Sequence, residues 1–102
     1  MDLPQEDWTK QLKKDTNAVI LDVRTADEVE QGSIPNAKNI DIFKGQEFLD
    51  AVEALDKTKH YYIYCKSGGR SAQACTIMHQ LGFENTYNLI GGFTNWVGDV
   101  KY

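Results

Sequence analysis

Cysteine is scarce in this chain of 102 residues, which contains only Cys65 and Cys75. Two cysteines ten positions apart form neither a CxxC pair nor the framework of a disulfide-rich domain. Histidine is equally scarce, with His60 and His79 standing apart from each other and from both cysteines. A structural zinc site needs several Cys, His or acidic ligands at short spacing. The sequence therefore predicts no metal site and no bound cofactor.

Positive charge and long apolar runs are also limited. Lysine and arginine total 11 against 15 aspartate and glutamate, so the net charge is −4 and no basic surface for nucleic acid is expected. No run of about 18 apolar residues occurs, and residues 1–15 lack the apolar core of a signal peptide. We therefore expect one cytoplasmic domain over residues 1–102, with neither a membrane nor a nucleic acid as partner.

Apolar patterning predicts alternating strands and helices. The runs Ala18 to Val23 and Tyr61 to Tyr64 are typical of strands buried on both faces of a parallel sheet. Weaker strand patterns occupy residues 38–42 and 86–89. Helical spacing predicts helices over residues 4–14, 46–56 and 71–81, and a short helix after Thr25 with Glu28 completing a capping box. This order predicts an α/β fold with a mostly parallel sheet and a ligand site beyond the carboxyl ends of its strands.

The segment from Cys65 to Ser71 joins a predicted buried strand to a helix and carries the chemistry. Adjacent glycines at 68 and 69 permit a tight curl that turns backbone N–H groups inward, as in an anion-binding nest. The helix that we expect to begin near Ser71 adds the positive end of its dipole. Lys66 and Arg70 contribute two full positive charges. Such surroundings lower the pKa of a cysteine from about 8.5 to roughly 3.5–7.5, and the thiolate is the nucleophilic form.

Less specific interpretations remain open for each of these features. Cys65 could be only a small buried hydrophobe at the end of a strand, as free cysteines often are. Cys75 lies on the predicted helix after the loop; it could be a resolving thiol, but we expect it to pack in the core. The acidic side chains of Asp27, Glu28 and Glu30 are predicted to lie on a solvated helix face.

Four segments together resemble the single-domain rhodanese-like sulfurtransferase family. They are Leu21-Asp22-Val23-Arg24, the turn Gly32-Ser33-Ile34-Pro35-Asn36-Ala37, the CxxGxR-type loop from Cys65 to Arg70, and Gly91-Gly92-Phe93-Thr94-Asn95-Trp96. They occur in the order of the family and span most of the chain. The turn departs from the family pattern at Ser33, where histidine is common, and at Asn36, where glycine is common.

The resemblance implies a rhodanese-like three-layer fold, with helices on both faces of the sheet, and a sulfur-transfer activity. Cys65 would take sulfane sulfur from thiosulfate or a persulfide, hold it as a persulfide and pass it to cyanide, a thiol or a protein acceptor. The cradle would consist of Lys66, Ser67, Gly68, Gly69 and Arg70. Asp22, Arg24 and Ser71 would support this loop, although a buried ion pair is an equally good explanation for Asp22 and Arg24.

Three other functions are compatible with the same residues. A cysteine phosphatase or arsenate reductase uses a related cradle, but its loop has five residues between Cys and Arg, whereas four lie between Cys65 and Arg70. A regulatory module of this fold would have little turnover. A dedicated sulfur carrier would form the persulfide on Cys65 but use thiosulfate poorly.

Overall fold

The computed structural model describes all 102 residues and contains five strands, four α-helices and two short 3-10 helices. The strands are β1 (Asp2–Leu3), β2 (Ala18–Asp22), β3 (Lys38–Asn39), β4 (His60–Tyr64) and β5 (Thr86–Leu89). The α-helices are α1 (Gln5–Lys14), α2 (Ala26–Glu30), α3 (Gln46–Glu53) and α4 (Gly69–Gln80), and the 3-10 helices are η1 (Ile42–Lys44) and η2 (Phe93–Asn95).

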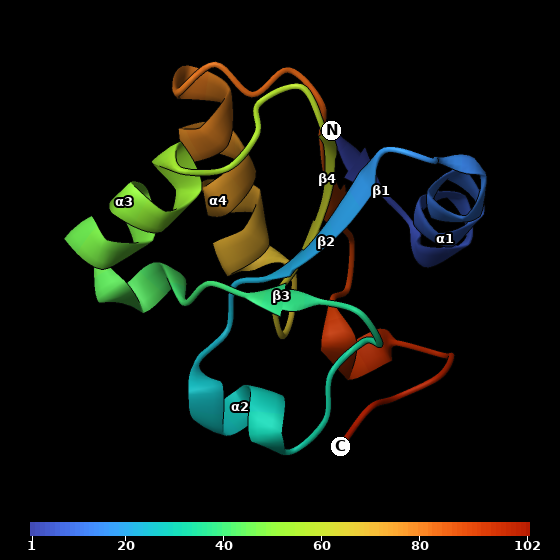
Figure 1. Ribbon diagram of the computed structural model, residues 1–102. Helices are drawn as coiled ribbons and strands as arrows, with labels where there is room; N and C mark the ends of the chain where they lie inside the picture. The colour runs from blue at the N-terminus through green and yellow to red at the C-terminus, as the bar shows by residue number, and fades with distance from the viewer.

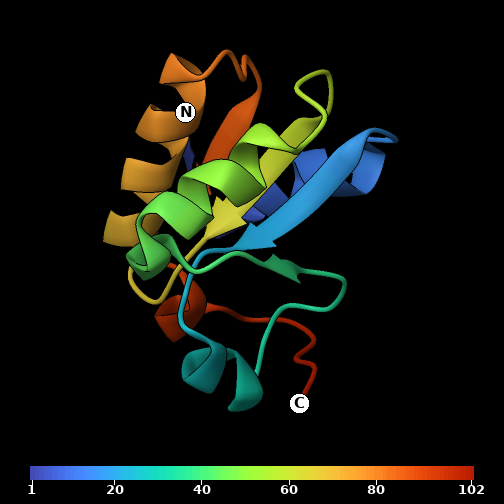
Figure 2. The same ribbon diagram turned by 60° about the vertical axis from the view of Figure 1, so that its left-hand side comes forward.

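The five strands form one sheet in the order β1-β5-β4-β2-β3, and every pairing is parallel. Helices α3 and α4 cover one face of this sheet and α1 covers the other, as Figures 1 and 2 show. The predicted α/β fold with helices on both faces is therefore confirmed. The short helix α2 and the C-terminal segment lie beyond the carboxyl ends of β2 and β4 (Figure 1). This is the edge of the sheet where parallel α/β folds bind their ligands.

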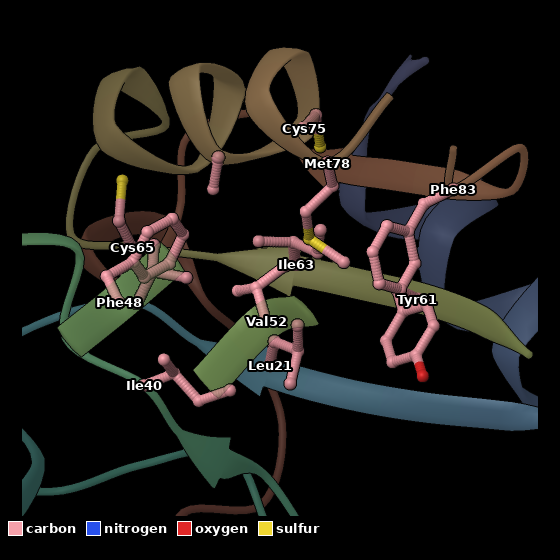
Figure 3. Packing of buried hydrophobic residues seen from close by; sticks show 12 residues of the cluster. Leu21, Ile40, Phe48, Val52, Tyr61, Ile63, Cys65, Cys75, Met78 and Phe83 are labelled. Atoms are coloured by element: carbon pink, nitrogen blue, oxygen red, sulfur yellow. The ribbon is translucent and has the colours of Figure 1, made fainter. Parts of the chain in front are cut away.

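The central strand β4 is buried on both faces, as its continuous apolar run predicts. Tyr61 and Ile63 face the cluster under α3 and α4 (Figure 3), whereas Tyr62 and Tyr64 face the smaller cluster under α1. Trp8 of α1 is fully buried in that smaller cluster and meets Tyr62 edge-on, with ring centroids 5.7 Å apart. Two packed cores therefore clamp β4 and define the position of the residue that follows it, Cys65.

Several predicted element boundaries were wrong by a few residues. Helix α4 begins at Gly69, not Ser71, so Arg70 lies in its first turn; α3 ends at Glu53, not at residue 56. The strand predicted over residues 38–42 stops at Asn39, and η1 follows it. The predicted capping box of α2 is confirmed, because the Thr25 hydroxyl accepts a hydrogen bond from the backbone N–H of Glu28 and the Glu28 carboxylate accepts one from the N–H of Thr25.

Two further features complete the frame of the site. Strand β1, which we did not predict, pairs with β5 and extends the sheet at the edge next to α4. Asn36 adopts the left-handed conformation with φ +70°, which asparagine tolerates better than most residues. This explains how the turn accepts Asn36 in place of glycine.

No helix of the structure is both long enough and apolar enough to cross a membrane.

Candidate active site

The sulfur of Cys65 lies at the end of β4, within a ring formed by the loop that follows it. The backbone N–H of Gly68 donates to Sγ at 3.1 Å, and the hydroxyl of Ser71 lies 3.3 Å from Sγ. Figure 3 shows this sulfur pointing toward the first turn of α4. The loop therefore turns hydrogen-bond donors toward Sγ, which is the geometry of an anion cradle.

These donors determine the direction of the Cys65 pKa. Burial is the largest single influence and raises the pKa, but hydrogen bonds from Ser71, Gly68 and Ser67 together outweigh it, so the pKa lies below its ordinary value. The residue is nevertheless 0% exposed. Cys65 is thus a stabilised thiolate site enclosed by its own loop, and a reactant can reach the sulfur only if the covering side chains or the loop move.

Glycines hold this loop in place from two sides. Gly68 has φ +107°, a conformation that L side chains rarely adopt. Gly92, with φ +57°, packs so closely that an added Cβ would lie 2.6 Å from the carbonyl oxygens of Cys65 and Lys66. The neighbouring N–H groups of Phe93 and Thr94 donate to those same two oxygens at 2.9 Å. The segment Gly92-Phe93-Thr94 therefore acts as a backbone clamp on the cysteine loop.

Arg70 does not point into the cradle as a free cation. Its two terminal nitrogens donate to the two carboxylate oxygens of Glu28 at 2.7 and 2.9 Å, and its guanidinium lies over the ring of Phe43 at 5.2 Å. The hydrogen bond from Arg70 is the largest influence on the Glu28 carboxyl and lowers its pKa. Burial opposes this effect only in part, and the pKa falls to about 2. The prediction that Glu28 lies on a solvated helix face is therefore wrong. The ion pair connects α2 to the first turn of α4 beside Cys65.

Asp22 and Arg24 form a buried ion pair at the end of β2. Arg24 donates from Nη2 to Asp22 at 2.7 Å, and both side chains are at most 4% exposed. The hydroxyl of Tyr64 donates to the same Asp22 carboxylate at 2.6 Å and accepts from the N–H of Ile34 at 3.0 Å. Because Tyr64 directly precedes Cys65, this network holds the end of β4 in place. No hydrogen bond connects Asp22 or Arg24 to the sulfur. Their geometry therefore matches the second explanation given above, a buried ion pair that holds the end of the strand.

Comparison with known proteins identifies this architecture. Residues 5–99 match the family described as Rhodanese-like domain. This chain belongs to the rhodanese-like family.

Relatives of the chain carry sulfurtransferase names. It is 37% identical over 91 residues to the thiosulfate sulfurtransferase GlpE of Coxiella burnetii, covering 89% of this chain and 80% of that protein. It is 30% identical over 95 residues to a sulfurtransferase of Allochromatium vinosum, covering 93% of this chain and 86% of that protein. The crystal structure of a rhodanese-like domain protein from Staphylococcus aureus superposes with a TM-score of 0.83 at 29% identity, covering 98% and 95% of the two chains. At the level of the family, these sulfurtransferase-named relatives support a rhodanese-type enzyme.

The remaining loop residues of this rhodanese-like chain lie at the surface. Lys66, Ser67 and Gly69 are exposed, and no salt bridge involves Lys66. Cys75 is buried on the inner side of α4, and burial, the dominant influence, raises the pKa of its thiol to about 11. Its placement matches the prediction of core packing. The structure contains no group of three or more His, Cys, Asp or Glu side chains arranged to hold a metal ion.

Sequence reasoning missed two contributors to the site. Glu28 was predicted to complete the capping box and to lie on a solvated helix face, but not to bind Arg70, although one of its carboxylate oxygens serves both the cap and Arg70. Phe43 carries no motif, yet it is 69% exposed and covers the Arg70 guanidinium. An aromatic residue directly after the weak strand pattern of residues 38–42 was the one signal that could have indicated it.

Proposed function

We propose that this chain transfers sulfane sulfur through a persulfide on Cys65, in a two-step double displacement. The proposal depends on one observation: the Cys65 sulfur lies among inward-facing donors from Gly68 and Ser71. Such donors stabilise a thiolate, and they would equally stabilise the negative terminal sulfur of a persulfide. No second catalytic side chain is required by this chemistry.

In the first step, the Cys65 thiolate attacks the sulfane sulfur of the donor. With thiosulfate, the sulfur–sulfur bond of the donor breaks, sulfite leaves with the bonding electron pair, and Cys65 becomes a persulfide anion. In the second step, an acceptor thiolate or cyanide attacks the terminal sulfur, and the electrons of the broken bond return to Sγ. Since each half-reaction leaves a covalent intermediate or the free thiolate, the kinetics should be ping-pong.

The full enclosure of Cys65 also supports a second candidate, a dedicated sulfur carrier. A persulfide formed in this ring would be protected from water until a partner protein displaced the covering loop. Such a carrier would still form the Cys65 persulfide, but its turnover of thiosulfate with cyanide would be slow.

The deciding experiment is intact-mass spectrometry after incubation with thiosulfate or, separately, with glutathione persulfide. We expect a gain of one sulfur atom that remains in the Cys75→Ser variant and disappears in Cys65→Ser. Parallel double-reciprocal plots with cyanide as acceptor would then establish double displacement. If neither donor adds sulfur to Cys65, both the enzyme and the carrier proposals fail, and a regulatory module of the same fold remains. Turnover of an aryl phosphate that depends on Cys65 would instead indicate phosphatase chemistry.

A further inference from the structure

A cavity of about 250 Å³ opens beside the cysteine loop and has no role in the steps described above. We call it the Arg24 pocket; it is lined by Arg24, Glu28, Gln31, Lys66, Phe93 and Thr94. Strands β2 and β4 pair in parallel with Asp22 opposite Tyr64. Arg24 and Lys66 each follow two residues later, beyond the ends of these two neighbouring strands, and both line the pocket. The pocket therefore begins one residue beyond Cys65.

Arg24 presents an unused donor at this pocket. Its Nε and Nη2 atoms bind Asp22, and Nη2 also donates to the carbonyl of Gly32 at 2.8 Å. None of these hydrogen bonds uses Nη1. The side chain is 4% exposed and its guanidinium lies 4.5 Å from the centre of the Phe93 ring, so its position is defined by packing. A guanidinium nitrogen held this way is a preorganised donor for an anionic oxygen.

The charges around the pocket sum to one unpaired positive charge. Asp22 balances Arg24, and Glu28 is engaged through both oxygens by Arg70. Lys66 has no ion-pair partner, and it is an exposed residue among those that line the pocket. The side chains of Gln31 and Thr94 add uncharged hydrogen-bonding groups. A singly charged group with two acceptor oxygens, such as a carboxylate, matches this set.

The position of the pocket suits the acceptor better than a small inorganic donor. In thiosulfate the anionic oxygens lie next to the reacting sulfur, so they would occupy the Cys65 ring itself. A pocket one residue away instead fits a charged group separated from the reacting sulfur by several bonds. Its volume lies below the range of about 300–1,000 Å³ typical of drug-sized ligands, which favours a small thiol acid.

We propose that the Arg24 pocket binds the carboxylate of the sulfur acceptor and so selects thiols that carry one. This inference rests on the proposed function. The carboxylate would bind Arg24 Nη1 and the Lys66 ammonium while the acceptor thiolate attacks the terminal sulfur of the persulfide. The new sulfur–sulfur bond forms on the acceptor, the old one breaks, and the electron pair returns to Cys65 Sγ. The thiol proton is released to the buffer before attack.

The test compares three acceptors that share a two-carbon thiol and carry a negative, a neutral or a positive group at its far end: 3-mercaptopropionate, 2-mercaptoethanol and cysteamine. The protein is loaded with sulfur, the gain of mass on Cys65 is verified, and the rate of discharge by each thiol is measured. Intrinsic thiol reactivity cancels when the ratio of the carboxylate thiol to the neutral thiol is compared between variants. We expect this ratio to fall about fivefold in Lys66→Gln, as for loss of one partly exposed ion pair. In Lys66→Glu the preference should shift toward cysteamine.

The matched control is Lys14→Gln, which removes an exposed lysine at the end of α1. Lys14 precedes Asp15, and the Asp15 carboxylate contacts His60 at the start of β4, the end of the strand opposite to Cys65. This control should leave the ratio unchanged. Equal slowing of all three thiols in both Lys66 variants would overturn the proposal, because it would indicate a merely structural role for Lys66. Normal loading with no change in any ratio would also overturn it while leaving the proposed function intact.

A binding measurement tests the pocket even if loading fails. Unreactive propionate is titrated against the ¹⁵N-labelled protein, with propanol as the neutral control. We expect propionate alone to shift the Gln31 side-chain amide and the Thr94 backbone amide, and the shifts to weaken in Lys66→Gln. Equal responses to propanol, or no response at either residue, would contradict a carboxylate subsite.

Discussion

Ser71→Ala is the substitution that most directly tests how the ring controls the Cys65 sulfur. The Ser71 hydroxyl is fully buried and has two acceptors within reach, Cys65 Sγ at 3.3 Å and the Gly68 carbonyl at 3.2 Å. A hydrogen bond to a charged group contributes about 1.5–3 kcal/mol, whereas a neutral one contributes about 0.5–1.5 kcal/mol. The thiolate therefore gains about 1–1.5 kcal/mol from the reorientation of this hydroxyl. Because 1.36 kcal/mol corresponds to one pH unit, the variant should raise the Cys65 pKa by about one.

The kinetic consequence depends on pH. Below both pKa values the variant holds about tenfold less thiolate, but a more basic thiolate is also more nucleophilic, with a Brønsted coefficient of about 0.4–0.5. The net loss of reactivity should be about three- to fourfold there. Above both pKa values the variant should react as fast as the wild type or faster. The assay is the rate of iodoacetamide alkylation of Cys65 against pH, read by peptide mass spectrometry.

Thr76→Ala is the control, because the Thr76 hydroxyl bonds to a carbonyl on the exposed side of the same helix. It should leave the Cys65 profile unchanged. An unchanged midpoint in Ser71→Ala would mean that the hydroxyl serves only the Gly68 carbonyl. A uniform loss of rate at every pH would mean a distorted loop. Either result would refute the reasoning about the thiolate.

Three further predictions follow from the same geometry. Burial raises the pKa of Cys75 to about 11, whereas at Cys65 the effect of burial is outweighed by hydrogen bonds from the loop, which lower its pKa. Iodoacetamide at neutral pH should therefore label Cys65 faster than Cys75, and labelling at comparable rates would contradict this difference in thiolate stability. Gly92→Ala should destabilise the fold by several kcal/mol, because the residue has a positive φ and the added Cβ would lie 2.6 Å from two backbone oxygens. Urea unfolding measures the loss of stability. Gly45→Ala is the control, because Gly45 also has a positive φ but no atom lies within 4 Å of its added Cβ. Glu28→Gln should lower the free energy of unfolding at pH 7 by about 1–2 kcal/mol, allowing for solvent screening of a partly exposed pair. The pKa of Glu28 in the folded state is about 2, below its value in the unfolded chain. The stability contributed by the Glu28 carboxylate is therefore complete above about pH 5 and falls with acidification. At pH 3 about half of the stability difference between wild type and Glu28→Gln should remain. A difference that grows as the pH falls would reverse the assigned sign.

Local sequence patterns determined the main elements of the fold and the location of the reactive cysteine. The apolar run of β4, the glycines after Cys65 and the helical spacing beyond them each depend on residues close together in the chain. The capping box at Thr25 and Glu28 was predictable for the same reason, because it spans a single helical turn. Element ends were less accurate, as in α4, where the first turn includes Gly69 and Arg70 although glycine is a poor helix former.

Only the tertiary structure decided which charged groups surround the sulfur and how they are paired. Arg70 and Glu28 are 42 residues apart, and so are Tyr64 and Asp22. No periodicity or motif spacing specifies such contacts, because they arise when the β2–β4 pairing brings two loop ends together. The same packing encloses Cys65, buries Arg24 and leaves its Nη1 without a hydrogen bond at the edge of a cavity. The nucleophile could be found in the sequence because it depends on a local loop, whereas access to it and the selection of its partners depend on residues that folding brings together from across the chain.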